Sequence, residues 1–264
     1  MLIRKSKTIE TPLSPSDLFC NMSGSAAFRI VETYKSIRTS LLFTLANGGD
    51  NAILVTSAEP NSGKSVTTAN LALSFAQTGA KVLVVDCDMR NPSQQKIFAR
   101  ENTKGLSNVL CGMCNFADVV KQNVQQNLDL LTAGQTPPNP SELLSSENMR
   151  ALLDALKTQY DFVLLDSPPV EVVSDTVSLV LNASQVVVVA RQNHAIYDEV
   201  IHTVDTIKSV GGKILGAILT DVHEDNKSYS YAASTYSHYG RRKRYGYYGS
   251  MTEKNAPAES KVKK

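Results

Sequence analysis

Five short, almost entirely apolar runs recur along the 264-residue chain and constrain its fold more than any other feature. None of them alternates apolar with polar residues, so each is typical of a strand that is buried on both faces. Helical patterns separate the runs, and this alternation predicts an α/β fold with a doubly wound, mostly parallel sheet and helices on both faces. The runs span residues 53–56, 82–85, 162–165, 186–189 and 214–219, and the main helices are predicted at 27–46, 65–77, 147–159 and 195–209.

The first apolar run leads into a loop that is followed at once by a helix. The loop matches the pattern GxxxxGK[ST], except that an alanine stands at the first glycine position. Gly63 lets backbone N–H groups approach phosphates, Lys64 can bridge the β- and γ-phosphates, and the Ser65 hydroxyl can ligate Mg²⁺. The sequence therefore predicts a phosphate loop that binds ATP with Mg²⁺. The predicted nucleotide-binding residues are Ala58, Glu59, Pro60, Asn61, Ser62, Gly63, Lys64, Ser65 and Val66.

Carboxylates follow two other apolar runs. Asp86 and Asp88 end the run at 82–85, and Asp166 ends the run at 162–165. The carboxyl ends of parallel strands share one edge of the sheet, so we expect these carboxylates to converge near the phosphate loop. There they could hold metal-bound water or accept a proton from an attacking hydroxyl. The alternative, in which each aspartate only caps a helix or solvates a strand end, fits one such residue better than three.

The phosphate loop also argues against one group of proteins with this fold. Cytosolic ATPases that place septa or partition DNA carry a second lysine just after the first glycine of the loop. Glu59 stands there in this chain and cannot supply positive charge to a phosphoryl transition state. A partition-type ATPase switch therefore remains only as an alternative hypothesis. A nucleotide-binding scaffold with a recruiting tail is a further alternative.

The last 40 residues differ in composition from the rest. The whole chain carries a formal charge of +2 and residues 225–264 carry +6, which leaves −4 for the remainder. The tail lacks apolar periodicity, and we expect it to be disordered. A basic aromatic tail could bind nucleic acid or anionic membrane, but no base-reading module accompanies it, and we expect no nucleic-acid partner. We predict instead that its tyrosines are phosphorylated, namely Tyr229, Tyr231, Tyr236, Tyr239, Tyr245, Tyr247 and Tyr248.

The remaining composition favours a cytoplasmic protein. The four cysteines are too few for a disulfide framework, the amino terminus lacks the apolar stretch of a signal peptide, and no run reaches the roughly 20 apolar residues of a membrane helix. We predict three parts: a flexible segment at 1–24, a nucleotide-binding domain at 25–224 and the tail at 225–264.

Taken together, these motifs resemble those of the bacterial protein-tyrosine kinases, in particular the free-standing cytoplasmic type associated with capsule and exopolysaccharide export. The likeness runs from about residue 28 to 222. It rests on the variant phosphate loop, on the second motif Asp86-x-Asp88-x-Arg90, on Asp166 followed by Ser-Pro-Pro, on the segment 134–144 and on the tyrosine cluster.

The resemblance implies a role for each matching residue. Lys64, Asp86 and Asp88 would be catalytic, with Asp86 as the base for the incoming tyrosine hydroxyl. Ser65, Asp88 and Asp166 would surround Mg²⁺. Which aspartate serves as base and which as metal ligand is left open by the spacing.

The resemblance also implies partners. They are a separate transmembrane activator of polysaccharide export, which would hold the chain at the inner face of the membrane, a tyrosine phosphatase, and further copies of the chain in a reversible ring. The family's oligomer motif on the first helix corresponds to Glu32, Lys35 and Arg38, with lysine in place of the first arginine. Lysine keeps the charge but loses the bidentate fork. Thr220 stands where relatives of the fold often place an asparagine near the adenine.

Overall fold

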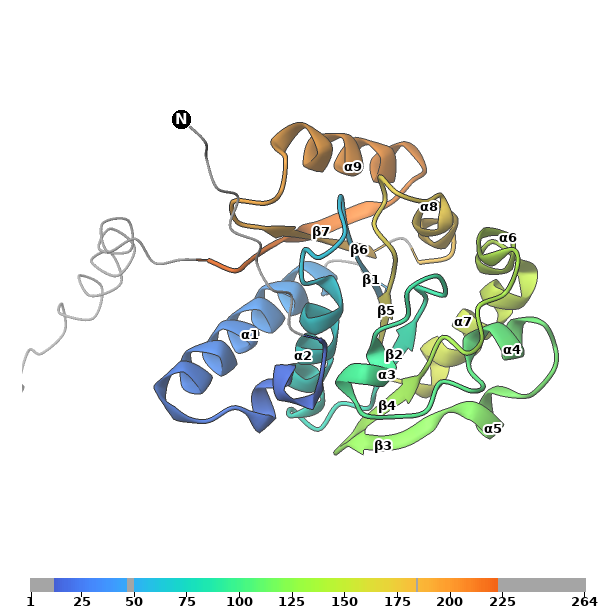
Figure 1. Cartoon of the computed structure of the whole chain (residues 1–264), viewed down its shortest axis with the longest axis horizontal. Coiled ribbons are helices and arrows are strands. Elements are labelled where there is room, and N and C mark those ends of the chain that lie inside the picture. Colours follow the sequence, from blue (N-terminus) through green and yellow to red (C-terminus); the bar gives the residue numbers. More distant parts are fainter. Residues whose placement is uncertain (1–11, 47–49, 184, 223–264) are drawn as a thin grey trace, which may run out of the picture. The chain divides into compact units, whose positions relative to one another are not determined.

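The computed structural model describes residues 12–46, 50–183 and 185–222, and these form a seven-stranded sheet with helices on both faces (Figure 1). The strand order is β3-β4-β2-β5-β1-β6-β7, and every neighbouring pair is parallel except β3 with β4. The predicted α/β, mostly parallel fold is thus confirmed. The strands are β1 (Ala52–Ser57), β2 (Val82–Asp86), β3 (Lys121–Gln125), β4 (Leu128–Leu131), β5 (Phe162–Asp166), β6 (Gln185–Arg191) and β7 (Lys213–Thr220).

All five apolar runs form strands, but two further strands escaped the sequence interpretation. β3 and β4 make an antiparallel hairpin at one edge of the sheet, with Asn127 in the left-handed region at φ 60° in the turn. Edge strands that face water can carry polar residues, and β3 reads Lys-Gln-Asn-Val-Gln. The apolar signal that revealed the central strands is therefore missing from it.

Alternate residues of the central strands enter two separate cores. In β1, Ala52 and Leu54 pack on the side of α7, α8 and α9, whereas Ile53 and Val55 pack on the side of α1, α2 and α3. This division explains why the strands have no polar face. The helices are α1 (Gly24–Leu45), α2 (Lys64–Ala76), α3 (Gln94–Ile97), α4 (Leu106–Leu110), α5 (Phe116–Val119), α6 (Pro140–Leu144), α7 (Glu147–Gln159), α8 (Asp175–Val180) and α9 (Tyr197–Ser209).

The segment before α1 departs from expectation. Residues 12–23 were predicted to be flexible, but they include two 3₁₀ turns, Pro15–Asp17 and Phe19–Asn21. Leu18 and Phe19 are buried in the core, and the side-chain amide of Asn70 on α2 bonds the backbone at both Asp17 and Phe19. The prediction was wrong for these residues because two apolar side chains suffice to anchor a short segment when a buried amide satisfies its backbone. Residues 1–11 lie outside the described part of the chain.

The parallel strands place loops of different kinds at the two edges of the sheet. The carboxyl ends of β1, β2 and β5 lead into the phosphate loop and the two predicted acidic motifs. The amino ends of β2, β4 and β5 lie at the opposite edge. Among the described residues, none of the helices has the length and apolar character needed to span a bilayer.

Candidate active site

The phosphate loop joins the carboxyl end of β1 to α2. Gly63 caps α2 with a φ of 83°, a left-handed conformation that L-residues with a side chain rarely adopt. A Cβ at this position would also lie 3.4 Å from the Thr220 side chain, whose hydroxyl donates to the carbonyl of Ser62 at 2.7 Å. The glycine is therefore required by the left-handed turn, whereas the contact with Thr220 would be an ordinary van der Waals distance.

Glu59 is the centre of the hydrogen bonds within the phosphate loop. The hydroxyls of Ser57 and Ser62 both donate to its carbonyl oxygen at 2.7 Å. Its side-chain Oε2 lies 3.7 Å from His194 Nε2, and its Oε1 is buried without a hydrogen-bond partner among the described residues. The position that carries a lysine in partition ATPases thus holds a mostly buried carboxylate.

Asp86 and Asp166 lie directly opposite each other on neighbouring strands, because β2 and β5 pair in that register. Both are fully buried. Asp86 Oδ2 accepts from the backbone N–H groups of Ser93 at 3.0 Å and Gln94 at 2.9 Å, and Oδ1 accepts from that of Asp88 at 3.2 Å. Burial, followed by repulsion from Asp166, raises the pKa of Asp86 well above its usual range.

Lys64 lies near two of the three carboxylates, and its single charge cannot neutralise all three. Its Nζ is 3.7 Å from Asp88 Oδ2, and its charge counteracts the burial that raises the pKa of Asp166. Asp166 Oδ1 is buried and has no hydrogen-bond partner among the described residues. An excess of buried negative charge with an unpartnered carboxylate oxygen beside a serine hydroxyl fits a hard divalent cation.

The described side chains do not by themselves make a closed metal cage. No group of three or more His, Cys, Asp or Glu residues in the described ranges has metal-binding geometry. Mg²⁺ in phosphate-loop proteins takes only one or two protein carboxylates and completes its shell with phosphate and water oxygens. The predicted ligands Ser65, Asp88 and Asp166 are compatible with that arrangement.

A glutamine connects the parts of the site and was missed from the sequence. Gln94 Nε2 donates to Asp166 Oδ2 at 2.7 Å and to the carbonyl of Ser65 at 3.0 Å. The neighbouring Ser93 hydroxyl bonds the Ser65 hydroxyl at 2.9 Å. Gln94 is the first residue of α3 and Ser93 is its N-cap, and no spacing rule distinguishes them from other polar residues in the sequence.

Arg90 has a defined contact that its motif did not reveal. Its guanidinium donates to both oxygens of Asp175, with Nε at 2.8 Å and Nη2 at 3.1 Å. Asp175 is fully buried at the start of α8 and also accepts from the Ser141 hydroxyl on α6. The pair therefore ties the loop after β2 to the segments that follow β4 and β5.

The residues of the predicted oligomer motif on α1 already make contacts within the chain. Lys35 Nζ forms an ion pair with Glu32 at 2.8 Å, one turn away on the exposed face. Arg38 reaches α2, where it donates to the carbonyl and the hydroxyl of Ser74. Ser74 lies in the last turn of α2, where carbonyls lack helical partners. The motif residues thus lie together, but Arg38 already stabilises a helix end.

The end of β7, where Thr220 stands in place of an asparagine, borders the phosphate loop. Thr220 contacts the loop directly, as described above, and the adjacent Asp221 forms an ion pair with Arg191 at 2.9 Å. The predicted phosphorylation sites, Tyr229 to Tyr248, fall outside the described residues.

The fold and the loop define the class: a P-loop nucleotide-binding protein of the doubly wound type. A family model described as an AAA domain matches residues 51–215. The chain is 38% identical to CapB of Staphylococcus aureus over 206 residues, which cover 76% of this chain and 89% of CapB. It is 36% identical to the tyrosine-protein kinase YwqD of Bacillus subtilis, covering 83% of this chain and 86% of YwqD.

The solved structures agree with the sequence comparison. The kinase domain of the Escherichia coli tyrosine kinase ETK superposes with a TM-score of 0.72 at 35% identity, covering 75% of this chain and 78% of that domain. The chain spans only 28% of the length of the whole E. coli protein. This chain belongs to the bacterial tyrosine-protein kinase family.

Proposed function

We propose that the chain transfers the γ-phosphoryl group of ATP to tyrosine hydroxyls in its own carboxyl-terminal cluster. The observation that carries this proposal is the grouping of three carboxylates, Asp86, Asp88 and Asp166, at the end of the phosphate loop, with Lys64 near two of them. A nucleotide-binding scaffold would have no need for so many buried charges, which cost free energy when no ligand balances them.

Each residue has a proposed task. Lys64 and the loop N–H groups bind the phosphates, and Ser65, Asp88 and Asp166 hold Mg²⁺. When bound, Mg²⁺ would neutralise charge on the phosphate oxygens. Asp86 accepts the proton of the tyrosine hydroxyl, since its Oδ1 accepts only one backbone bond and therefore keeps acceptor capacity.

The basic tail is a suitable substrate in charge and length. Each phosphate adds about −1.5 to −2, so four phosphotyrosines bring the tail from +6 to about zero. The stretch from 225 to 248 would span roughly 27 Å as a random coil and about 80 Å when fully extended. These lengths suit reaction with a neighbouring copy. The proposal includes a kinase domain at residues 25–224 and a substrate tail at residues 225–264.

Membership of the family supports the proposed partners. A transmembrane activator of capsule or exopolysaccharide export would recruit the chain to the inner face of the membrane, and a tyrosine phosphatase would reverse the modification. Copies would associate reversibly in a ring through Glu32, Lys35 and Arg38. Because Arg38 bonds Ser74, ring contact through that side chain requires it to exchange or share this partner.

The decisive experiment measures phosphotyrosine on purified full-length chain with Mg-ATP, with and without the activator's cytoplasmic segment. Lys64→Met should abolish the signal, and a Lys104→Met variant on the exposed surface serves as the matched control. Mass spectrometry should place the phosphates within residues 229–248, and replacing all seven tyrosines with phenylalanine should remove them. An undiminished signal in Lys64→Met would exclude this site as the source of activity.

The proposed ring has its own test. Light scattering on unphosphorylated protein should show a higher mass for the wild type than for Glu32→Ala/Arg38→Ala. A monomer in both, with the activator segment present, would leave this part of α1 as ordinary surface.

A further inference from the structure

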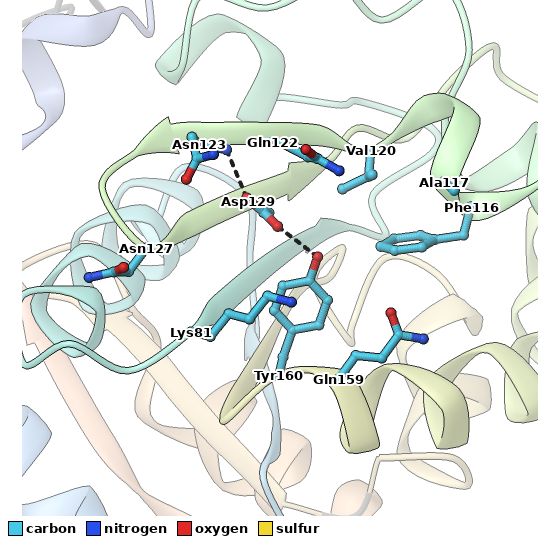
Figure 2. A pocket seen from close by; sticks show the side chains of 10 residues that line it. All are labelled: Lys81, Phe116, Ala117, Val120, Gln122, Asn123, Asn127, Asp129, Gln159 and Tyr160. Atoms are coloured by element: carbon cyan, nitrogen blue, oxygen red, sulfur yellow. Dashed lines mark hydrogen bonds between the residues drawn. The ribbon is translucent and has the colours of Figure 1, made fainter.

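A pocket of about 470 Å³ lies at the edge of the sheet opposite the phosphate loop (Figure 2). Lys81 directly precedes β2, Asn127 directly precedes β4, and Tyr160 lies just before β5. These three strands are parallel, so the positions share the amino edge, whereas the nucleotide site follows the carboxyl ends. The pocket is therefore separate from the site described above.

One wall of this amino-edge pocket is built around Tyr160. The phenol donates to Asp129 Oδ2 at 2.8 Å, and the backbone N–H of Asn123 donates to Oδ1 at 2.7 Å (Figure 2). The Phe116 ring packs edge-on against Tyr160 at 6.5 Å between centroids. Both oxygens of the carboxylate are engaged, so Asp129 fixes the wall and is a poor candidate for holding a cation.

Lys81 supplies an available positive charge. Its Nζ lies 4.6 Å from the centre of the Tyr160 ring, and it makes no ion pair with any residue that the structure describes. A cation–π contact leaves the ammonium hydrogens able to bond an anion. The pocket can thus satisfy one negative charge.

Two carboxamides with free polar atoms line the pocket. The side chains of Gln122 and Gln159 point toward it and make no hydrogen bond to any described residue (Figure 2). Each carboxamide offers donors and an acceptor, which matches hydroxyl groups that both donate and accept. Phe116 and Val120 add an apolar surface beside them. A ligand that suits this lining has one anionic group, several hydroxyls and an apolar C–H face.

We propose that the amino-edge pocket binds a hexose-sized sugar that carries one anionic group, either a carboxylate or a phosphate. Lys81 pairs with the anion, Gln122 and Gln159 bond the hydroxyls, and the C–H face of the ring packs on Phe116. The volume lies within the range of small-molecule sites. This site goes beyond the proposed kinase function, because none of its residues belongs to the nucleotide site.

The test measures binding to the full-length chain without nucleotide, by ligand-observed NMR and calorimetry. The probes are glucuronate, glucose 6-phosphate and neutral glucose, and the first two distinguish a carboxylate from a phosphate. We expect at least one anionic sugar to bind at least 10-fold more tightly than glucose. Lys81→Met keeps the aliphatic stem and should weaken that binding at least 10-fold, because it removes a charge-assisted hydrogen bond.

Matched variants separate this site from the nucleotide site. Lys64→Met makes the same change in the phosphate loop and should leave sugar binding within twofold, and Gln159→Met should weaken it several-fold. The proposal is overturned if neither anionic sugar binds, if Lys81→Met binds like the wild type, or if Lys64→Met abolishes binding. The phosphotyrosine assay reports on the kinase function independently of all three outcomes.

Discussion

Polar groups lie at both ends of β2 and β5, and they are satisfied in different ways at the carboxyl edge and at the amino edge of the sheet. At the carboxyl edge, Asp86 and Asp166 face each other without solvent, and their pKa values rise. At the amino edge, the carboxylate of Asp129 is partly exposed and receives one donor on each oxygen, from Tyr160 and from the backbone of Asn123.

The difference indicates which edge requires a ligand to be electrostatically complete. Three carboxylates against one lysine leave uncompensated charge at the carboxyl edge, and an oxygen of Asp166 has no partner among the described residues. At the amino edge, the Asp129 carboxylate has its hydrogen-bond partners without any ligand. The groups that could still bind a ligand there are the exposed carboxamides and Lys81. We expect mutations at the carboxyl edge to change activity strongly and those at the amino edge to change stability modestly.

The strongest test of this contrast is Asp86→Asn. The carboxamide keeps the volume but cannot accept the proton of tyrosine, so turnover should fall by about 10²- to 10⁴-fold. Nucleotide affinity should stay within about threefold, because the base acts on the acceptor. Phosphotyrosine kinetics and nucleotide titration measure the two quantities. An equal loss of binding and turnover would place Asp86 in the metal shell instead.

A smaller effect is expected for Asp175→Asn, which removes the charge that holds Arg90. Arg90 is about half exposed, so the loss of unfolding free energy should be about 1–3 kcal/mol, below that for a fully buried pair. Denaturant unfolding measures it. Asp154→Asn is the matched control, because Asp154 is exposed and lies 3.9 Å from Lys157, and it should change stability by less than about 0.5 kcal/mol. Equal effects would show that the Arg90 contact is not structural.

At the amino edge, Tyr160→Phe should cost about 1 kcal/mol of stability through the hydrogen bond to Asp129 and leave phosphotransfer unchanged. Burial, together with Asp129, raises the pKa of Tyr160 above its ordinary value. The contribution is therefore present below the unfolded pKa of about 10 and is lost as the pH rises through the folded pKa. Urea unfolding of both proteins at pH 8 and above pH 10 checks the sign. Lost phosphotransfer in this variant would contradict the contrast between the edges.

The smallest effect concerns an exposed pair outside both edges. The hydrogen bond from His202 to Glu171 raises the pKa of His202 above its ordinary value. The pair therefore stabilises the fold below about pH 6.5, and this contribution disappears as the pH rises through the folded pKa. An NMR titration should show the His202 midpoint moving down in Glu171→Gln. An unchanged midpoint would remove Glu171 as the cause.

The sequence alone determined the central sheet and the nucleotide-binding loop. Strands buried on both faces leave uninterrupted apolar runs, and a loop whose backbone binds phosphate requires Gly63, Lys64 and Ser65 at fixed spacing. Both signals lie in short stretches of sequence, so they can be recognised without knowledge of the fold. The position of the three aspartates at strand ends was readable for the same reason.

Only the tertiary structure decided what these residues contact. The register that sets Asp86 against Asp166, the Gln94 bridge to Ser65, and the pairing of Arg90 with Asp175 join segments that are distant in sequence. The polar strand β3 and the anchored segment around Phe19 gave no periodic signal, because an edge strand and a short turn need only a few buried contacts. Local propensity fixes which elements form, but the packing of those elements selects the partners of each polar side chain, and those partners determine its charge and its role.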